Sequence, residues 1–402
     1  MLALDFNYKK ANEPGDDADA SFTYDDAKLF FERTWGEDDE YFFQARTNVL
    51  GQGAENVTFD RFFVEMPFFF DSRLTVGRFV WNLEGDYKLG LPGTGTWDGD
   101  SGIATNWEWD GFGLKKNFAI GSLSAVVAHP GNGDARRGIA NRNNLSVFRD
   151  ANGNIVNTWS GYLFMLGFDA QFTEQIGLNL GGEVVIGDNA EDDITYVNNQ
   201  VQAGNNPLAF DKFWEVWAGL RFNFNDNIAF KGIFYHQAMD TDAATAAGWR
   251  SNGYGIIDNN GNVVDDANHW ALMFDVKQEA LKYTSLWLEY GQYDQGFITR
   301  TDRQIAYGPM LGDVIGVQAP VDLKYWRVAL GQEWNDKWAT HIFYYGYKYD
   351  VNNGPKPSEI GVGVQYKLND YTTMGLNYIH TDMDVDGVDN DDSVRFRTSI
   401  SF

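Results

Sequence analysis

An acidic stretch near the C-terminal end of the chain has the residue types and spacing of a cation site. Asp382, Asp384 and Asp386 alternate with other residues and Gly387 follows them, as in the first half of an EF-hand calcium loop. The position that should supply a bidentate glutamate is Ser393, and the flanking segments have strand patterns. We therefore expect no EF-hand. A loop-bound Ca²⁺ or Mg²⁺ on the three aspartates is the alternative to ordinary solvated carboxylates, and no other cofactor is expected.

Acidic and basic side chains also gather around one Gly-rich segment, residues 82–106. Charges of opposite sign that face each other across a narrow water-filled space create a field that discriminates solutes by charge and dipole. The acidic members lie in the segment and the basic members in strand-like sequences around it: Glu84, Asp86, Asp98 and Asp100, and Arg46, Arg61, Arg78 and Lys115. If the chain forms a channel, as the resemblance given below implies, we expect these residues to line its pore constriction. The alternative is that the basic residues form ordinary ion pairs in the wall.

The histidines give no support for catalysis. His129, His236, His269, His341 and His380 form no pair at i and i+4, and none accompanies a recognisable nucleophile motif. We therefore predict that the protein is not an enzyme and has no catalytic residues.

The elements that would position the charged groups are amphipathic β-strands. Apolar and polar side chains alternate in residues 41–49, 162–172, 176–186, 213–224, 359–368 and 393–402. Since successive side chains of a strand point to opposite faces, each segment has one apolar face and one polar face that is rich in small residues.

Short and long connections alternate along the chain. Eight tight turns lie near residues 36–39, 70–72, 119–121, 173–175, 225–227, 279–281, 335–337 and 369–371, and many contain Asn or Asp, which suit turns. Nine longer connections, most of them rich in Gly, Asn and Asp, separate them. This alternation predicts a single transmembrane antiparallel up-and-down β-barrel over residues 1–402 with about 18 strands, or about 16, with short periplasmic turns and long extracellular loops. A soluble sandwich or propeller is the alternative, but no blade motif recurs.

Composition narrows the class further. The chain has 402 residues, of which 44% are hydrophobic and 16% aromatic, and no run of about 18 apolar residues that would form a transmembrane helix. The absence of cysteine excludes a disulfide scaffold. The net charge of -26 argues against nucleic-acid binding and fits solvated loops or a pore that favours cations. No signal peptide is visible, so an exported protein would be represented here in a mature or trimmed form.

The C-terminal strand carries a resemblance to a known class. Phe396, Ile400 and the terminal Phe402 lie on one apolar face and resemble the signal that the barrel-assembly machinery of bacteria reads in outer-membrane proteins. The whole chain resembles the outer-membrane porin superfamily. The segments "LTVGRFVW" and "VRFRTSISF" are similar to the barrel part of S-layer-homology-type porins, although the periplasmic tethering domain of those proteins is missing from this sequence.

The resemblance implies a location and a function. We expect a homotrimer in the bacterial outer membrane, in contact with lipid and lipopolysaccharide, with the third outer loop (residues 82–106) folded into the lumen. The expected function is passive diffusion of small hydrophilic solutes and ions with a weak preference for cations. One alternative is a channel selective for sugars or a polyanion, which an aromatic track or an arginine-lined lumen would favour. Another is a structural, envelope-anchoring barrel.

Three aromatic residues bear on the first alternative. The alternation places Trp217, Trp287 and Tyr345 on the polar, inward faces of their strands. Inward aromatic rings can form a stacking track for sugars, or they can simply fill space near the wall.

Overall fold

The structure of the protein is a computed structural model. It describes residues 2–9, 19–51, 58–81, 83–84, 107–129, 147–149, 155–158, 161–187, 196–197, 200–201, 212–240, 264, 266–297, 321–351, 354–384 and 390–401.

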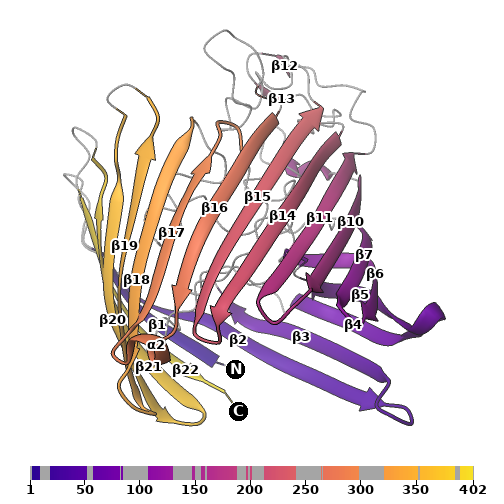
Figure 1. The fold of residues 1–402 in the computed structure, drawn as a ribbon, viewed down its shortest axis with the longest axis horizontal. Helices are drawn as coiled ribbons and strands as arrows, with labels where there is room; N and C mark the ends of the chain where they lie inside the picture. The colour runs from indigo at the N-terminus through magenta and orange to yellow at the C-terminus, as the bar shows by residue number, and fades with distance from the viewer. Residues whose placement is uncertain are drawn as a thin grey trace.

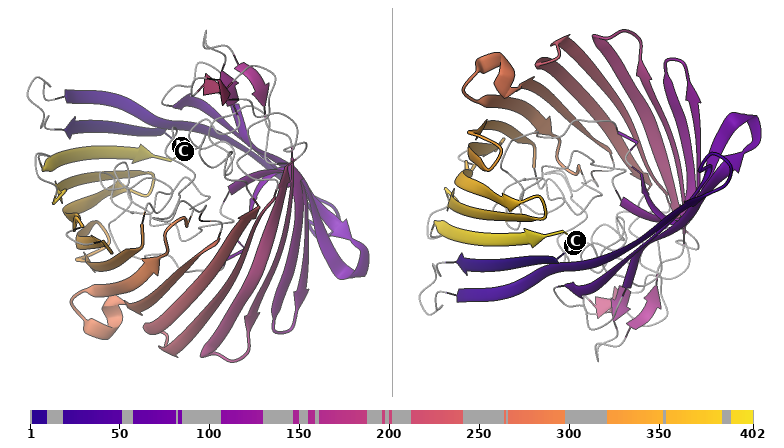
Figure 2. Two further views of the ribbon diagram at one scale, coloured as in Figure 1. Left: turned by 90° about the horizontal axis from the view of Figure 1, so that it is seen from above. Right: turned by 90° about the horizontal axis from the view of Figure 1, so that it is seen from below.

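The dominant element is one 18-stranded antiparallel sheet that closes on itself, and Figure 2 shows its strands arranged around a ring. Its strands are β1 (Leu2–Lys9), β2 (Asp19–Trp35), β3 (Tyr41–Gly51), β4 (Thr58–Phe68), β5 (Ser72–Trp81), β6 (Trp107–Phe118), β7 (Gly121–His129), β10 (Gly161–Gln171), β11 (Ile176–Gly187), β14 (Lys212–Asn225), β15 (Ile228–Asp240), β16 (Asp266–Val276), β17 (Ser285–Tyr293), β18 (Leu323–Glu333), β19 (Trp338–Tyr349), β20 (Ser358–Asn369), β21 (Thr372–Asp382) and β22 (Asp391–Ile400). Each strand pairs with the next one in chain order, so the predicted up-and-down barrel of 18 strands is confirmed.

The first and last strands close the barrel. β1 pairs with β22 in an unbroken antiparallel register from Leu2–Ile400 to Lys9–Ser393, and it pairs with β2 on its other side. Both termini therefore lie at the same end of the barrel, together with the short turns (Figure 1). Closure satisfies the backbone hydrogen bonds of the terminal strands, which would otherwise be exposed edges.

Asparagine side chains fix three of the short turns in the same way. The side-chain oxygens of Asn225, Asn335 and Asn369 each accept a hydrogen bond from the backbone N–H two residues later, over 2.8, 2.9 and 2.8 Å. This geometry is the Asx turn that the sequence pattern predicts. Two turns instead contain a short helix: the 3₁₀ helix η1 (Phe69–Asp71) and α2 (Gln278–Leu281).

The two faces of the sheet differ sharply in burial. In β18, buried and half-buried residues alternate almost without exception. On the outer face, large apolar side chains such as Phe164, Leu220 and Val362 are exposed. The apolar residues of the alternating pattern therefore face outward, as in a transmembrane barrel.

Helices contribute little to the fold. None of the helices in the described ranges has the length and apolar character needed to cross a bilayer. Two short hairpins, β8 (Val147–Arg149) with β9 (Ile155–Thr158) and β12 (Tyr196–Val197) with β13 (Gln200–Val201), form separate two-stranded sheets. In Figure 1, β12 and β13 lie at the top, at the end of the barrel that carries the long connections.

Inward glycines make room for inward aromatic rings on the neighbouring strand. Gly181 lies directly opposite Trp217, and Gly291 lies opposite Tyr325. A Cβ added at either glycine would collide with the facing ring. The small residues of the polar faces are thus the complement of the aromatic ones, an arrangement that stabilises cross-strand pairs.

Candidate functional site

The inner wall of the barrel carries a group of basic side chains on neighbouring strands, which we call the arginine wall: Arg46 on β3, Arg61 on β4, and Arg395 and Arg397 on β22. Strands β22, β1, β2, β3 and β4 are consecutive in the sheet, so these residues lie on one side of the lumen. All four side chains are only half-buried. Because Phe396 between the two β22 arginines is exposed on the outer face, Arg395 and Arg397 face inward.

Arg46 and Arg61 concentrate positive charge at one point of this wall. They occupy directly opposite positions of β3 and β4, beside a one-residue irregularity in the register. The Arg46 guanidinium lies 5.9 Å from the centre of the Phe30 ring, and Arg61 donates a 3.4 Å hydrogen bond to the side-chain oxygen of Gln44. Gln44 in turn donates to a Glu32 carboxylate oxygen over 2.5 Å. A ring contact orients Arg46 and a hydrogen bond orients Arg61, and both side chains stay half-buried.

A second group, the acidic wall, consists of Glu84, Glu183 on β11 and Glu215 on β14. Glu183 and Glu215 lie directly opposite each other in the sheet. Their exposed fractions are 3% and 0%, and that of Glu84 is 0%. Gln237 donates a hydrogen bond to Glu215, and Glu84 lies within electrostatic range of the same carboxylate. These acidic groups are therefore covered, whereas the side chains of the arginine wall are half-buried.

The beginning of the predicted constriction loop packs against the acidic wall. The Asn179 amide donates a 2.9 Å hydrogen bond to the Leu83 carbonyl, and the Trp217 indole N–H donates to the Asn179 side-chain oxygen over 2.7 Å. Gly167 faces Leu83, and a Cβ there would come within 3.0 Å of the Leu83 Cβ. Residues 83 and 84 thus lie against the inner wall. Asp86, Asp98 and Asp100 lie outside the described residues.

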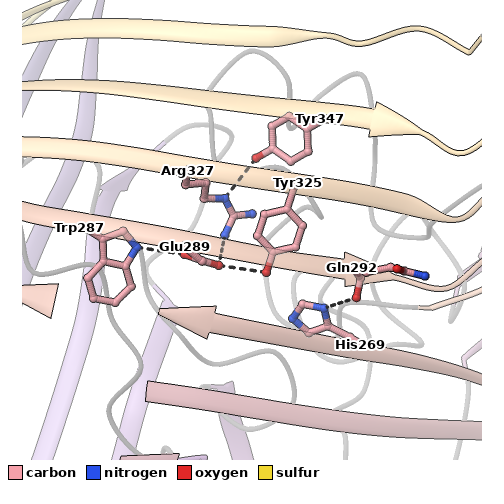
Figure 3. A network of polar contacts seen from close by, with 7 residues as sticks. All are labelled: His269, Trp287, Glu289, Gln292, Tyr325, Arg327 and Tyr347. Atoms are coloured by element: carbon pink, nitrogen blue, oxygen red, sulfur yellow. Dashed lines mark hydrogen bonds and ion pairs between the residues drawn. The ribbon is translucent and has the colours of Figure 1, made fainter. Parts of the chain in front are cut away.

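A buried network on β16 to β19 contains one more arginine. Arg327 donates a 2.8 Å hydrogen bond to Glu289, which also accepts from Tyr325 and Trp287 over 3.0 and 3.2 Å (Figure 3). The guanidinium lies 4.3 Å from the centre of the Tyr325 ring. With an exposed fraction of 2%, Arg327 is a structural charge in the wall and is not presented to solutes.

An aromatic belt crosses the same strands at one level. Tyr235, His269 and Tyr293 occupy matching register positions on β15, β16 and β17. The His269 and Tyr293 rings stack with centres 3.9 Å apart, and Tyr325 continues the series 5.3 Å from Tyr293. These rings are almost completely buried.

The three aromatic residues predicted to face inward do so. Trp217, Trp287 and Tyr345 all belong to the buried inner face, with exposed fractions of 2–6%. A sugar could not stack on rings that are covered to this extent. Their packing favours the space-filling interpretation over the sugar track.

Lys115 lines a cavity of about 480 Å³ on the inner side of β4 to β11. Arg73, Glu65 and Asp169 also line it, so the cavity presents both signs of charge. An Arg73 Nη2 atom lies 3.8 Å from a Glu65 carboxylate oxygen. The opposed charges expected of a constriction occur here, but the participation of Lys115 in the solute path stays a prediction.

The structure does not bring Arg78 to the lumen. Arg78 forms a two-point ion pair with Asp110, its direct neighbour on β6, through N–O distances of 2.6 Å. Asp110 shares the outer face of β6 with the exposed side chains of Phe112 and Leu114. The Arg78–Asp110 pair therefore lies on the outside of the barrel.

The remaining predicted positions lie near the chain's end. Asp382 accepts a 3.0 Å hydrogen bond from the Asp384 N–H, and Asp384 accepts one of 2.7 Å from the Lys356 N–H. Asp386 is outside the described residues, and the described part of the chain contains no cluster suited to a metal ion. Phe396 is exposed on the outer face, Ile400 pairs with Leu2 and Thr372, and Phe402 is not described.

Comparison with known proteins defines the class of barrel. No protein-family model and no curated protein matches the sequence. Among solved structures, OpdO of Pseudomonas aeruginosa superposes with a TM-score of 0.60 at 11% identity, covering 100% of this chain and 95% of its own. OccD3 (OpdP) of the same species gives 0.53 at 14%, with 100% and 91% covered, and OccAB4 of Acinetobacter baumannii gives 0.56 at 14%, with 99% and 96% covered.

These neighbours are Occ (OprD-family) outer-membrane porins. The chain has the same β-barrel fold as these structures. Identities this low establish the fold alone. The shared fold and the outward apolar face both indicate a β-barrel of the outer-membrane type. The narrower resemblance to S-layer-homology-type porins stays a prediction.

Sequence reasoning missed the residues that best define the two walls. Arg395 and Arg397 were visible as the polar face of the terminal strand, and Glu183 and Glu215 as polar-face residues of their own strands. The alternation alone would have placed all four inside the barrel. Their difference in burial depends on what packs over each wall, which no local pattern encodes.

Proposed function

We propose that the protein is a substrate-selective channel of the outer membrane that carries small anionic solutes past the arginine wall. The observation that carries this proposal is the unequal accessibility of the inner-wall charges. Arg46, Arg61, Arg395 and Arg397 are half-buried, whereas Glu84, Glu183 and Glu215 are shielded. A solute that passes between these two walls would therefore encounter the positive charges of the arginine wall more closely than the covered carboxylates.

The net charge of the chain does not determine the charge of the path. Charges separated from a solute by more than about 10 Å of salt solution are largely screened, whereas groups on the wall of a narrow lumen act at short range. Half-buried guanidinium groups attract anions and can bind carboxylate or phosphate oxygens in a two-point geometry. An arginine-lined lumen is also the feature that favours an anion channel over a sugar channel.

The comparisons support selectivity over general diffusion. The similar solved structures are substrate-specific channels, which favours the selective alternative for this chain as well. A general diffusion porin with a weak cation preference is the second candidate. The net charge of -26 favours it. A homotrimeric assembly and recognition by the barrel-assembly machinery are further proposals that rest on the porin resemblance.

Solute competition in a planar bilayer tests the proposal. We expect a small organic carboxylate to reduce the single-channel current at concentrations where a neutral sugar of similar size does not. Replacing Arg46 and Arg61 with glutamine should weaken this block, since the guanidinium groups would supply the attraction. Arg78→Gln is the matched control, because Arg78 lies on the outer face. Equal effects of the carboxylate and the sugar would contradict selectivity for anions and favour a general diffusion porin.

A further inference from the structure

The outer surface of the barrel contains an apolar groove over β10, β11 and β14, which we call the outer groove. Its volume is about 740 Å³, within the range of about 300–1,000 Å³ that is typical of ligand pockets. Its outward-facing apolar lining residues are Phe164, Leu166, Phe168, Leu180, Val184, Trp214 and Val216. Most of the outer face has large side chains, so a groove at this place needs a local cause.

Gly182 is that cause. It lies directly between Leu166 on β10 and Val216 on β14 in one register row of the sheet. The rows on either side carry Val184 and Leu180 at the β11 position. The missing side chain at Gly182 therefore leaves a depression in the middle of an otherwise apolar row. An added Cβ would come within 3.0 Å of the Glu215 carbonyl and 3.1 Å of a Val216 methyl group, so the floor of the groove is close-packed backbone and side chain.

The groove has the length of one membrane leaflet. Its lining begins at Lys212, the first residue of β14, and continues to the row of Phe168, Leu180 and Ala218. The six residue steps from Lys212 to Ala218 correspond to about 20 Å at about 3.3 Å per step. A strand tilted by about 45° converts this length to a depth of about 14 Å, close to half of the roughly 30 Å hydrocarbon core. An acyl chain of a single leaflet matches that depth.

A cation lies at the mouth of the groove. Lys212 is exposed, lines the groove and is the first residue of β14, so it lies at the end of β14 that follows the long connection after β11. It faces Ile186 on β11 and Asp240 on β15 in the register. The long connections of such barrels face the outside of the cell. Lys212 is thus placed at the headgroup level of the outer leaflet, where a Lys side chain attracts anionic lipid.

We propose that the outer groove binds one acyl chain of a phosphorylated, multiply acylated lipid of the outer leaflet, the chemistry of lipopolysaccharide, with a headgroup phosphate on Lys212. The apolar side chains of the groove bury the acyl chain, and Gly182 creates the space for this acyl chain. The ammonium group of Lys212 selects a lipid with an anionic headgroup over a neutral one.

The test is retention of purified lipopolysaccharide by the detergent-solubilised barrel, measured by native mass spectrometry. The wild-type protein should retain it, and should retain a dephosphorylated form more weakly. Gly182→Leu should reduce retention about tenfold, because its side chain fills the groove. Lys212→Gln should reduce retention about threefold for the phosphorylated lipid and leave retention of the dephosphorylated lipid unchanged.

Two matched variants control for general effects. Gly232→Leu adds the same side chain to the outer face of β15, where Gly232 lies between Leu220 and Leu272. Lys324→Gln removes another exposed rim cation, one that already donates a 2.8 Å hydrogen bond to Asp350. Both controls should retain lipid as the wild type does. Single-channel conductance should be unchanged in all four variants because their side chains face outward, so this proposal can fail independently of the channel function.

Two results would overturn the proposal. Equal lipid retention by Gly182→Leu and Gly232→Leu would show that the groove is not the binding site. Dissociation of an oligomer by Gly182→Leu, without loss of lipid, would show that a second copy of the chain occupies the groove.

Discussion

The acidic wall and the arginine wall face the same lumen but differ in how far the surrounding residues bury their charged side chains. Glu183 and Glu215 are covered, and the side chain of Gln237 and the start of residues 82–106 reach the acidic wall. Arg46 and Arg61 are oriented by Phe30 and Gln44 but stay half-buried. Burying a charge is costly unless it is paired, so covered charges serve the structure and accessible ones are available to solutes. If solutes follow the proposed path, the accessible wall charges rather than the net charge of the chain would set its selectivity.

The largest expected effect tests whether covered charges are structural. Replacing Glu289 with leucine would leave Arg327 buried without its 2.8 Å carboxylate partner. Breaking a buried pair in this way costs about 3–5 kcal/mol. We expect the variant to have a markedly lower melting temperature in detergent. Heat-modifiable migration on a gel measures this temperature. Lys324→Gln, which breaks an exposed ion pair with Asp350, should change the melting temperature little. An unchanged melting temperature in Glu289→Leu would contradict a structural role for the buried network.

The next effect concerns the packing that covers the acidic wall. Gly181→Val should destabilise the barrel by about 1–3 kcal/mol, because the new side chain would collide with the facing Trp217 ring. Gly182→Ala, on the opposite face of the same strand, should cost less since its contacts begin at 3.0 Å. Melting curves of both variants in detergent measure the difference. Equal losses of stability in the two variants would indicate that the inner face is loosely packed and that the Trp217 ring does not pack tightly against β11.

The comparison of the two walls can be sharpened by neutralising each in turn. Replacing Arg61 and Arg395 with glutamine should lower the anion-to-cation permeability ratio by about three- to tenfold, because accessible wall charges act at short range. Glu215→Gln should leave the ratio unchanged, since that carboxylate is covered. Reversal potentials of the two variants in a salt gradient provide the measurement. A larger change from Glu215→Gln than from the arginine replacements would invert the roles assigned to the walls.

The smallest effect is expected outside the lumen. Arg78→Gln removes a partly exposed ion pair with Asp110, and such pairs contribute about 0–1 kcal/mol. Neither stability nor ion selectivity should change measurably. A shift in reversal potential would place Arg78 in the solute path after all.

Much of the fold could be predicted from local patterns. Strict alternation identifies strands, and Asn-Asp turns such as the one at Asn335 identify the short connections, because both depend on neighbouring residues. The strand count and the common side of the termini follow from the alternation of short and long connections. These features were correct because the period of a strand and the chemistry of a turn are local.

The site was less predictable because it depends on contacts between distant segments. Arg78 was grouped with the constriction by its position in the chain, yet Gly77 next to it has a φ of +123° and Arg78 itself points outward to Asp110. Glu84 was placed near the lumen, but its burial beside Glu215 could not be read from its neighbours. Arg395 lies on the polar face of the last strand, and alternation alone predicts that it faces inward, but alternation does not predict how far it is buried.

The most direct test of the account is the reversal potential of the wild-type channel in a planar bilayer with a salt gradient. The account predicts an anion-selective sign despite the net charge of -26, because the arginine wall is less buried than the acidic wall across the lumen. A cation-selective wild-type channel, or a reversal potential that does not change when Arg46, Arg61, Arg395 and Arg397 are all replaced by glutamine, would contradict it.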